Sequence, residues 1–525
     1  MKNRDQIIPA YAAPVLLLLI MGVYAWYCIN FTEAPFEDAA ILMRYAGHFA
    51  HGHGIVWNIG EKPVDGATDF LFMIIIGLQV KLGLGLEFAV HISTFIAHIL
   101  TILLVWHTQR TLFKVNNAVA FLTTLYLAVG PALSYIAEYF GTPFFALFAA
   151  LSWYCVLQLI TGEIKSRTAL SFALLSLVTS LIRPEGVILT ALMLVTIVVI
   201  KGWKTSLIVI YYYTGIFLLL GGSYFIWRWN YFGYPLPNPF YKKGGFHPIA
   251  LFSSQFFVFK MCLPVLPVFL YGLYNKGARK TAIALLIPAV GFAFAFLFLS
   301  EEMNFGGRFQ YAILPMVLMA WPVLIWNRIP SIKFPGETWL AVLKLSFFII
   351  LAALVIFSQY KRARYEYFQD GRYKVARILA DYADKHYTLA TSEAGLLPLY
   401  SGWRTLDTWG LNDQWIAHNG NVTEEYIDAF KSHVIMFRAE FSPVKPFQGG
   451  SHDLLEMVMT LKAYAEKHNY ILAAAYGDNP QVAHYYYIRS DFPAANELVA
   501  RIRNVTYFWV ESGNKAKNYA LIEKP

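Results

Sequence analysis

The chain has 525 residues, of which 57% are hydrophobic and 17% aromatic, while only 14% are charged. This composition excludes a soluble protein of this length and predicts a membrane protein that crosses the bilayer many times. The formal net charge of +9 does not indicate nucleic-acid binding, because the basic residues form short clusters between apolar runs. Cys28, Cys155 and Cys262 lie in or beside such runs, so no disulfide framework or thiolate metal site is expected.

Eleven apolar runs have the length of a membrane-spanning helix. They fall near residues 7–29, 89–109, 117–133, 143–161, 168–182, 186–200, 206–228, 256–274, 281–299, 310–326 and 339–358. A shorter run covers residues 70–82. The first run lacks a small-residue cleavage site, so we expect an anchor rather than a cleaved signal peptide.

The connections between these runs are of two kinds. The first kind is short and basic, and holds Lys2 and Arg4, Arg110 and Lys114, Lys165 and Arg167, Lys201 and Lys204, Lys276, Arg279 and Lys280, and Arg328 and Lys333. The second kind carries acids, glycines and prolines, over residues 30–69, 134–143, 183–186, 230–245 and 300–308.

The two kinds alternate along the chain if residues 70–82 do not cross the membrane. The positive-inside rule then places every basic connection in the cytoplasm. We therefore predict about eleven transmembrane helices, a cytoplasmic N-terminus, and a re-entrant or interfacial helix over residues 70–82. A crossing at 70–82 would instead scatter the second kind of connection over both faces of the membrane.

The composition changes after Tyr360, and residues 361–525 hold no run of spanning length. Residues 361–386 have the pattern of an amphipathic helix that leaves the membrane. After it, strand-like segments (TLAT, HVIMFR, YILAAAYG and HYYYIR) alternate with helical ones (TEEYIDAFK, DLLEMVMTLKAYAEKH and AANELVARI). This alternation predicts a small α/β domain outside the cytoplasm, preceded by a membrane domain over residues 1–360.

The first external loop, residues 30–88, carries an unusual pair of acids. Residues 36–50 repeat apolar side chains at three- and four-residue spacing, which predicts a helix. Glu37 and Asp38 fall in its first turn, where acids are also ordinary helix-start signals. The helix dipole explains one carboxylate better than two adjacent ones that repel each other, so we favour a catalytic role. Asp38 is the favoured general base, with Glu37 as the alternative.

The second half of this loop contains two further acids. We expect Asp65 to face Glu37 and Asp38 across the loop, as a third catalytic candidate. Asp69 stands just before the run at 70–82, where it suits the N-cap of a helix. Three histidines resemble a metal cluster but are expected to be interfacial polar residues: His48, His51 and His53.

Basic residues outside the membrane predict an anionic ligand. Arg308 follows two glycines at a membrane edge, and its guanidinium matches the shape of a phosphate. Lys242 and Lys243 lie outside against the positive-inside bias. Arg183 and Glu185 interrupt an apolar stretch, and a salt bridge and a substrate contact are equally supported there.

Together these features predict a specific chemistry. A carboxylate base would activate a hydroxyl acceptor, basic residues would hold the phosphate of a membrane-embedded donor, and the helices would shelter a lipid tail. Polyprenyl-phosphate sugars are donors of this kind. The alternatives are a transporter or flippase, which would place its ionisable residues nearer the bilayer midplane, and a non-catalytic envelope assembly factor.

The first external loop resembles that of the GT-C superfamily of integral-membrane glycosyltransferases, in its AftB-like (arabinofuranosyltransferase) branch. The matching residues there are Glu37-Asp38, Arg44-Tyr45-Ala46, Gly52-x-Gly54, Asn58-x-Gly60-Glu61, Val64-Asp65-Gly66 and Thr68. Further matches are Arg183-Pro184-Glu185-Gly186, Pro235-Leu236-Pro237-Asn238-x-x-Tyr241, Arg308-Phe309, Glu393-Ala394-Gly395 and Asp407-x-x-Gly410-Leu411-Asn412-Asp413.

The resemblance implies a polyprenyl-phosphate sugar donor, an inverting transfer to a glycan, lipid or protein acceptor, and a place in the bacterial inner membrane. It also implies substrate contacts from Arg44, Asn238 and Tyr241, and a soluble domain that reads the acceptor. It assigns no metal ligand and leaves a divalent cation open. The chain departs from the pattern at Glu37, where the family has Asp, at Asp65, where it has Glu, and at residues 140–142, which lack the family's acid.

Overall fold

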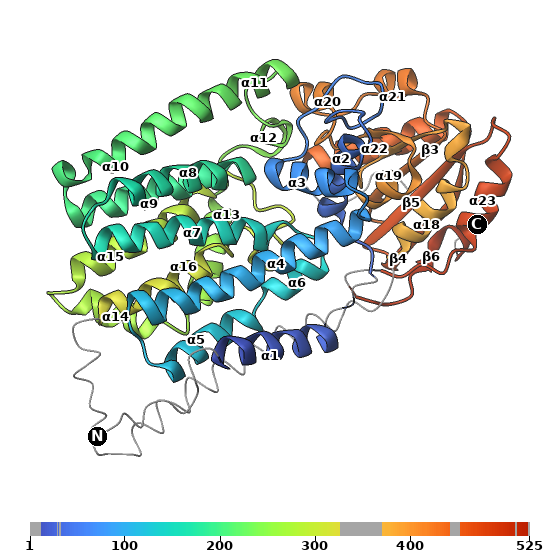
Figure 1. Cartoon of the computed structure of the whole chain (residues 1–525). Helices are drawn as coiled ribbons and strands as arrows, with labels where there is room; N and C mark the ends of the chain where they lie inside the picture. The colour runs from blue at the N-terminus through green and yellow to red at the C-terminus, as the bar shows by residue number, and fades with distance from the viewer. Residues whose placement is uncertain are drawn as a thin grey trace.

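The computed structural model describes residues 12–28, 30, 33–325, 370–441, 452–509 and 512–522. A helical part precedes a part built around a β-sheet (Figure 1). The boundary predicted near residue 360, the span near 339–358 and the basic connection with Arg328 and Lys333 lie outside the described residues.

The helical part follows the apolar runs of the sequence. Its elements are α1 (Ala12–Cys28), α2 (Glu37–Ala50), α3 (Phe70–Lys81), α4 (Leu86–His107), η1 (Thr108–Leu112), α5 (Asn117–Ala128), α6 (Ala132–Ala137), α7 (Thr142–Thr161), α8 (Ser166–Ile182), α9 (Gly186–Lys201), α10 (Trp203–Ile216), η2 (Phe217–Gly221), α11 (Gly222–Phe232), α12 (Asn238–Lys243), α13 (Pro248–Cys262), α14 (Leu266–Tyr274), α15 (Arg279–Ala295), η3 (Phe305–Gly307), α16 (Ile313–Ala320) and η4 (Trp321–Leu324). The helix predicted over residues 36–50 is confirmed as α2.

Four helical stretches in the described part of the chain are long and apolar enough to cross a membrane: Leu86–Leu112, Asn117–Ala137, Thr142–Thr161 and Trp203–Phe232. A fifth candidate is the pair α13 and α14, which meet at an angle of 98°. The continuous helix predicted over 256–274 is therefore wrong. Pro264 and Pro267 stand at the bend, and proline removes a helix hydrogen bond and clashes with the preceding turn.

Helix α3 occupies the short apolar run at 70–82. Its 12 residues span about 18 Å at ~1.5 Å per residue, well short of the roughly 30 Å hydrocarbon core of a bilayer. It packs against α2, α4 and α8. A helix of this length is short for a crossing, and the re-entrant or interfacial position of residues 70–82 stays a prediction.

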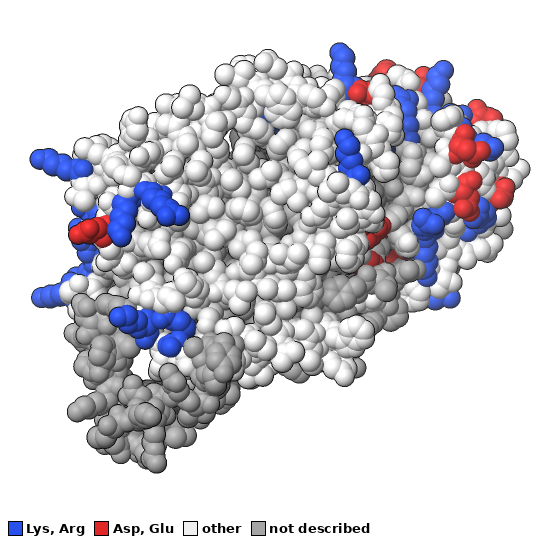
Figure 2. Space-filling model, viewed as in Figure 1, with Lys and Arg blue, Asp and Glu red and all other residues white. Residues whose placement is uncertain are grey.

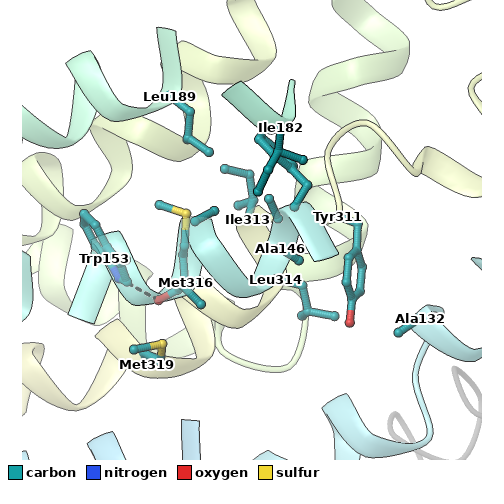
Figure 3. Close-up of a cluster of buried hydrophobic side chains, with 14 of the residues drawn as sticks. Ala132, Ala146, Trp153, Ile182, Leu189, Tyr311, Ile313, Leu314, Met316 and Met319 are labelled. Carbon is teal, nitrogen blue, oxygen red and sulfur yellow. Dashed lines mark hydrogen bonds between the residues drawn. The ribbon is translucent and has the colours of Figure 1, made fainter. Parts of the chain in front are cut away.

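The core of the helical part is centred on α7. Trp153 of α7 is fully buried, and its Nε1 donates to the carbonyl of Met316 on α16 at 2.9 Å (Figure 3). Leu189 of α9 and Ile182 of α8 close the same cluster. The bond satisfies the indole donor in an apolar setting, where an unpaired donor would be costly.

The second part is a mixed sheet with strand order β2-β1-β3-β5-β4-β6. Its strands are β1 (Thr388–Thr391), β2 (Arg404–Asp407), β3 (Val434–Ala439), β4 (Tyr470–Asn479), β5 (Val482–Arg489) and β6 (Lys517–Asn518). Strand β1 pairs with β2 and β3 in parallel, and the other pairs are antiparallel. The strands predicted from TLAT, HVIMFR, YILAAAYG and HYYYIR are confirmed as β1, β3, β4 and β5.

Helices cover both faces of this sheet. They are α18 (Gly371–Ala380), α19 (Leu396–Ser401), α20 (Gln414–Asn419), α21 (Glu424–Phe430), α22 (His452–Lys467), α23 (Ala495–Arg503) and α24 (Tyr519–Ile522), with η6 (Ala383–Lys385). Helices α18 and α23 share one apolar core with the sheet, and α20, α21 and α22 share the other. The predicted C-terminal α/β domain is therefore present, and α2 lies against its helix α19 (Figure 1).

The charged side chains follow this two-part architecture. On the face shown in Figure 2, lysine and arginine gather at the end of the helical part remote from the α/β domain, and both signs of charge cover the α/β domain. The surface between them is almost uncharged on this face. Large apolar side chains are exposed along α10, η2 and α11, such as Tyr211 on α10 and Leu218 on η2. This pattern suits a chain whose helical part is surrounded by lipid.

Candidate active site

A cavity of about 450 Å³ lies where the helical part meets the α/β domain. Its walls come from α2, the loop before α3, the segment before α7, the turn between α8 and α9, α12, and the segment that precedes α16. The charged residues of the lining are Asp38, Asp69, Arg183, Glu185, Lys243, Glu302 and Arg308. Leu411 of the α/β domain completes the wall, so both parts of the chain contribute to the cavity.

Asp38 and Arg308 form one of the ion pairs in the lining of this cavity. Arg308 Nη2 lies 2.6 Å from Asp38 Oδ2, and the Asp38 side chain is 24% exposed against 8% for Arg308. The guanidinium also lies over the ring of Phe140, 3.9 Å from its centre, and donates from Nε to the carbonyl of Met303 at 3.1 Å. Arg308 is thus fixed by a second partner and a ring, while Asp38 keeps access to the cavity.

A second group of ion pairs is centred on Arg183. Its Nη1 lies 3.2 Å from Asp69 Oδ1, and its Nη2 lies 2.7 Å from Glu185 Oε1. All three residues line the cavity. The sequence supported a salt bridge and a substrate contact equally for Arg183 and Glu185. The structure is compatible with both, because their buried salt bridge forms part of the cavity wall.

Asp69 departs from its predicted role as a helix cap. It stands at the N-cap position of α3 but makes no capping hydrogen bond with its side chain. Its carboxylate instead faces Arg183, a charged partner that is worth more to a buried acid than a backbone N–H. Burial raises the pKa of this carboxyl. Asp69 is therefore a cavity residue that its local sequence, which is typical of a helix cap, does not reveal.

The two adjacent lysines point to different places. Lys243 lines the cavity, with its Nζ 3.2 Å from Glu302 Oε2. Lys242 turns to the α/β domain, where its Nζ donates to the carbonyl of Gly420 at 2.5 Å and lies 4.5 Å from the ring centre of Trp409. The predicted ligand contact through Lys242 is therefore not supported by its position.

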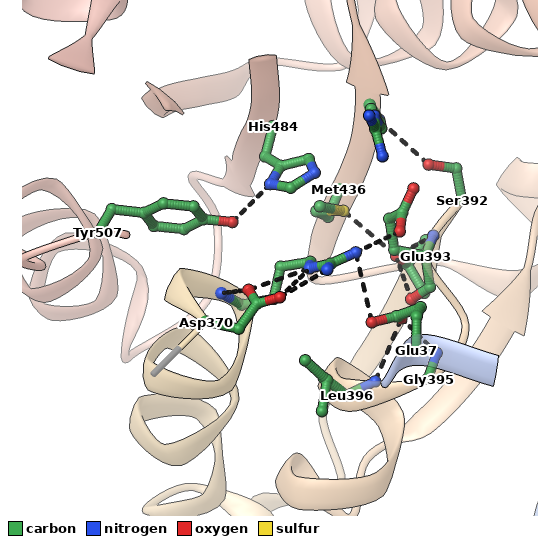
Figure 4. A network of polar contacts seen from close by, with 12 residues as sticks. Glu37, Asp370, Ser392, Glu393, Gly395, Leu396, Met436, His484 and Tyr507 are labelled. Atoms are coloured by element: carbon green, nitrogen blue, oxygen red, sulfur yellow. Dashed lines mark hydrogen bonds and ion pairs between the residues drawn. The ribbon is translucent and has the colours of Figure 1, made fainter. Parts of the chain in front are cut away.

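Glu37 does not face the cavity. Its Oε1 accepts hydrogen bonds from the backbone N–H of Gly395 at 2.5 Å and of Leu396 at 3.2 Å (Figure 4). Its Oε2 lies 3.4 Å from Nη1 of Arg372 in the first turn of α18. Successive residues of a helix point about 100° apart, so Asp38 turns to the cavity while Glu37 turns into the α/β domain.

Asp65 is also directed away from Asp38. It is 4% exposed, and its Oδ2 lies 2.6 Å from Nη2 of Arg228 on α11. The expectation that Asp65 faces Glu37 and Asp38 is therefore wrong. A buried carboxylate needs a charged partner, and Arg228 on α11 is that partner. Gly66, the next residue, does line the cavity.

Three residues implied by the resemblance join the two parts of the chain rather than line the cavity. Arg44 donates to the carbonyls of Trp57 and Trp403, both at 3.0 Å. Asn238 donates from Nδ2 to the carbonyls of Gly410 and Leu411, at 2.8 and 3.0 Å. The ring of Tyr241 packs on that of His418, with 4.2 Å between ring centres. Their positions indicate structural roles at the junction.

No group of three or more histidine, cysteine, aspartate or glutamate side chains is arranged to hold a metal ion in the described ranges. His48, one of the three loop histidines, uses Nδ1 to contact the carbonyl of Val56 at 2.9 Å. The structure therefore assigns no ligand set to the divalent cation that the resemblance left open.

The Glu37 carboxyl gives a prediction about pH and stability. Burial, opposed by Arg372 and reinforced by Glu393 and Asp370, raises the pKa of Glu37 from 4.5 to about 8. The folded state then holds a proton that the unfolded chain releases at lower pH, so the free energy of unfolding should fall as pH rises from about 4.5 to about 8. Glu37→Gln should flatten this slope in thermal unfolding followed by tryptophan fluorescence. Glu497→Gln, an exposed change on α23 of the α/β domain, should keep the parental slope, and a parental slope in Glu37→Gln would contradict the prediction.

Comparison with known proteins adds to this geometry. Residues 358–523 match a family model described as "Domain of unknown function (DUF8728)". No curated protein matches the sequence. Among solved structures, ArnT from Cupriavidus metallidurans in the apo state is 15% identical and has a TM-score of 0.54, with 90% of this chain and 97% of that chain covered. The same protein bound to undecaprenyl phosphate is 14% identical, with a TM-score of 0.53 and coverage of 91% and 98%.

A third structure is the oligosaccharyltransferase of Archaeoglobus fulgidus in complex with Zn and sulfate. It is 12% identical, has a TM-score of 0.50, and covers 92% of this chain and 74% of that chain. The chain has the GT-C fold. At these identities the likeness concerns the fold alone; it agrees with the predicted GT-C-like architecture and leaves the AftB-like branch open.

Proposed function

We propose that this chain is a GT-C glycosyltransferase that moves a sugar from a polyprenyl-phosphate donor to a hydroxyl of a cell-envelope glycan, lipid or protein outside the cytoplasm. The observation that carries the proposal is the contact between the partly exposed carboxylate of Asp38 and the buried guanidinium of Arg308 in one cavity. The fold supports it, since ArnT of the same fold binds undecaprenyl phosphate. The motifs of the first loop favour the AftB-like branch.

The charges of the cavity suit a single displacement at the anomeric carbon of the sugar. The acceptor oxygen forms a bond to that carbon while the bond from the carbon to the phosphate oxygen breaks. The acceptor proton passes to the carboxylate of Asp38, which acts as general base. Arg308, Arg183 and Lys243 offset the charge on the polyprenyl phosphate that leaves. Attack opposite the leaving group inverts the configuration.

The apolar part of the cavity wall offers a place for the start of the lipid tail. It is built from Ile188 of α9, Leu236 and Phe240 around α12, and Phe296 and Leu299 after α15. These side chains adjoin Lys243, so an apolar chain and a phosphate can be bound together there. This arrangement suits an amphipathic donor better than a free sugar nucleotide, whose polar base would meet the same apolar wall.

The test is a transfer assay with purified protein in lipid nanodiscs. Polyprenyl-phosphate sugars that carry a radiolabel in the sugar are supplied singly with a delipidated envelope extract as acceptor. We expect one of these donors to pass its labelled sugar to the acceptor, with release of polyprenyl phosphate. Movement of intact labelled donor across a proteoliposome without release would instead support a transporter, and no release with any donor would contradict the proposal.

The proposed topology gives a separate prediction. In a background without native cysteines, Asp453→Cys on α22 should react with a membrane-impermeant maleimide added to intact cells. Lys165→Cys in the turn before α8 should react only after the cells are opened. Both positions are exposed in the structure, so membrane sidedness alone should separate them. Labelling of Lys165→Cys in intact cells would show that this turn lies outside the cytoplasm and would contradict the proposed orientation.

A further inference from the structure

The first turn of α2 is held by the α/β domain from its acidic side. Glu37 bonds to the N–H groups of Gly395 and Leu396, at the start of α19. Arg372 joins this contact, since its Nη1 lies 2.5 Å from Glu393 Oε2 and 3.4 Å from Glu37 Oε2 (Figure 4). An ion network of the α/β domain therefore ends on the residue that precedes Asp38.

Gly395 brings the two backbones into direct contact. A Cβ atom at this position would overlap the carbonyl oxygen of Glu37 and lie 2.7 Å from its carbonyl carbon and 2.8 Å from its Cα. Real Cβ atoms essentially never approach backbone this closely, and backbone cannot rotate away as a flexible side chain can. A glycine is therefore required wherever α19 begins this close to α2.

The other cavity segment of the first loop is held in the same way. The backbone N–H of Asn238 donates to the carbonyl of Asp65 at 2.9 Å, and the Asn238 side chain bonds to Gly410 and Leu411. A Cβ atom on Gly66 would overlap Oδ1 of Asn412. The sequence motifs at 393–395 and 407–413 thus meet the first loop, whereas the resemblance assigned their domain to reading the acceptor.

We propose that Glu37 is a positioning residue through which the α/β domain, at Gly395 and Arg372, sets the direction of Asp38 toward Arg308. The inference rests on the proposed function, because it takes Asp38 as the general base. Rotation of the first turn of α2 by a small angle would move the Asp38 carboxylate from the acceptor hydroxyl. A misplacement of about 1 Å in a catalytic group can lower a rate by about a hundredfold.

The variants that test this role act from both sides of the contact. Gly395→Ala forces the first turn of α2 away from α19, and Glu37→Ala removes the acceptor of both N–H bonds. Both should lower kcat by roughly tenfold to a hundredfold, with the KM for the donor within about threefold, since Arg308 and Arg183 are untouched. Glu37→Gln keeps an oxygen that can accept the same two N–H bonds and should restore most of the lost kcat.

The matched control is Gly47→Ala on the same helix. A Cβ atom on Gly47 meets nothing within 4 Å, and alanine is the better helix former. This variant should keep the parental kcat. If Glu37→Gln loses activity as fully as Glu37→Ala, the ionised acid itself is needed and the positioning role is overturned.

Hydrogen–deuterium exchange gives a measurement that needs no donor. The amides of a peptide covering residues 36–45 should exchange faster in Gly395→Ala and Glu37→Ala than in the parental protein or Gly47→Ala, because the first turn of α2 has lost its support. Equal exchange in all four proteins would overturn the inference, as would faster exchange with unchanged kcat. If the parental protein transfers no sugar, the proposed function fails, and the exchange rates still decide whether the α/β domain holds this turn.

Discussion

Replacement of Asp38 by asparagine should lower sugar transfer by about a hundredfold to ten-thousandfold, the usual worth of a positioned general base. Asparagine has nearly the same shape but cannot take the proton of the acceptor hydroxyl. The donor should still bind, because loss of the carboxylate leaves the guanidinium of Arg308, 2.6 Å away, free for a phosphate. The measurement is kcat in the nanodisc assay, together with the affinity for undecaprenyl phosphate.

Two further variants separate Asp38 from the other acids of the first loop. Glu37→Gln should retain far more activity, because Glu37 faces Gly395 and Leu396 rather than the cavity. Asp69→Asn should lower activity less than Asp38→Asn, since the Asp69 carboxylate is held by Arg183. Transfer at the parental rate in Asp38→Asn would remove this residue as the base, and collapse in Asp69→Asn alone would move the role to Asp69.

Substitution of Arg308 should act on donor binding. Hydrogen bonds to charged groups contribute about 1.5–3 kcal/mol, so Arg308→Ala should weaken binding of undecaprenyl phosphate by roughly tenfold or more. Arg308→Lys keeps the charge but loses the two-pronged guanidinium, and should recover only part of the affinity. The quantity to measure is the dissociation constant of undecaprenyl phosphate in nanodiscs.

The matched control for Arg308 is Arg404→Ala. Arg404 pairs with Glu61 at 2.6 Å but is 51% exposed, and exposed pairs contribute little. Its loss should leave the affinity unchanged. Because Arg308 is buried, the thermal unfolding midpoint of each variant is recorded beside the affinity. An Arg308→Ala protein that is folded and binds as tightly as the parent would show that Arg308 does not contact the phosphate.

The local pattern of the sequence was sufficient to predict several of the helices and strands. The spacing of apolar side chains predicted α2 over residues 36–50, and alternating runs predicted β1, β3, β4 and β5. These predictions succeed because the spacing of apolar residues along a short segment shows which side chains share one face of a helix or strand. The bend of 98° between α13 and α14 was missed although Pro264 and Pro267 mark it. The prediction rested on apolar content, and residues 256–274 are mostly apolar.

Chemistry-bearing residue types were also visible in the sequence. Asp38, Arg308 and Lys243 were selected because acids and external basic residues are rare in so apolar a chain. The structure brings all three to one cavity. Sequence could not pair Asp38 with Arg308, since 270 positions separate them along the chain.

Tertiary structure alone decided which acid faces the cavity. The sequence determined that Glu37 and Asp38 point in different directions, because neighbours on a helix lie about 100° apart. Which of the two faces the cavity depends on how α2 is rotated, and that rotation is set by Gly395, 358 positions away. In the same way Asp65 forms an ion pair with Arg228, 163 positions away. Asp69 forms one with Arg183, 114 positions away. Helix periodicity is a local property of the chain, whereas the partner of a buried charge is chosen by contacts that form only when distant segments pack together.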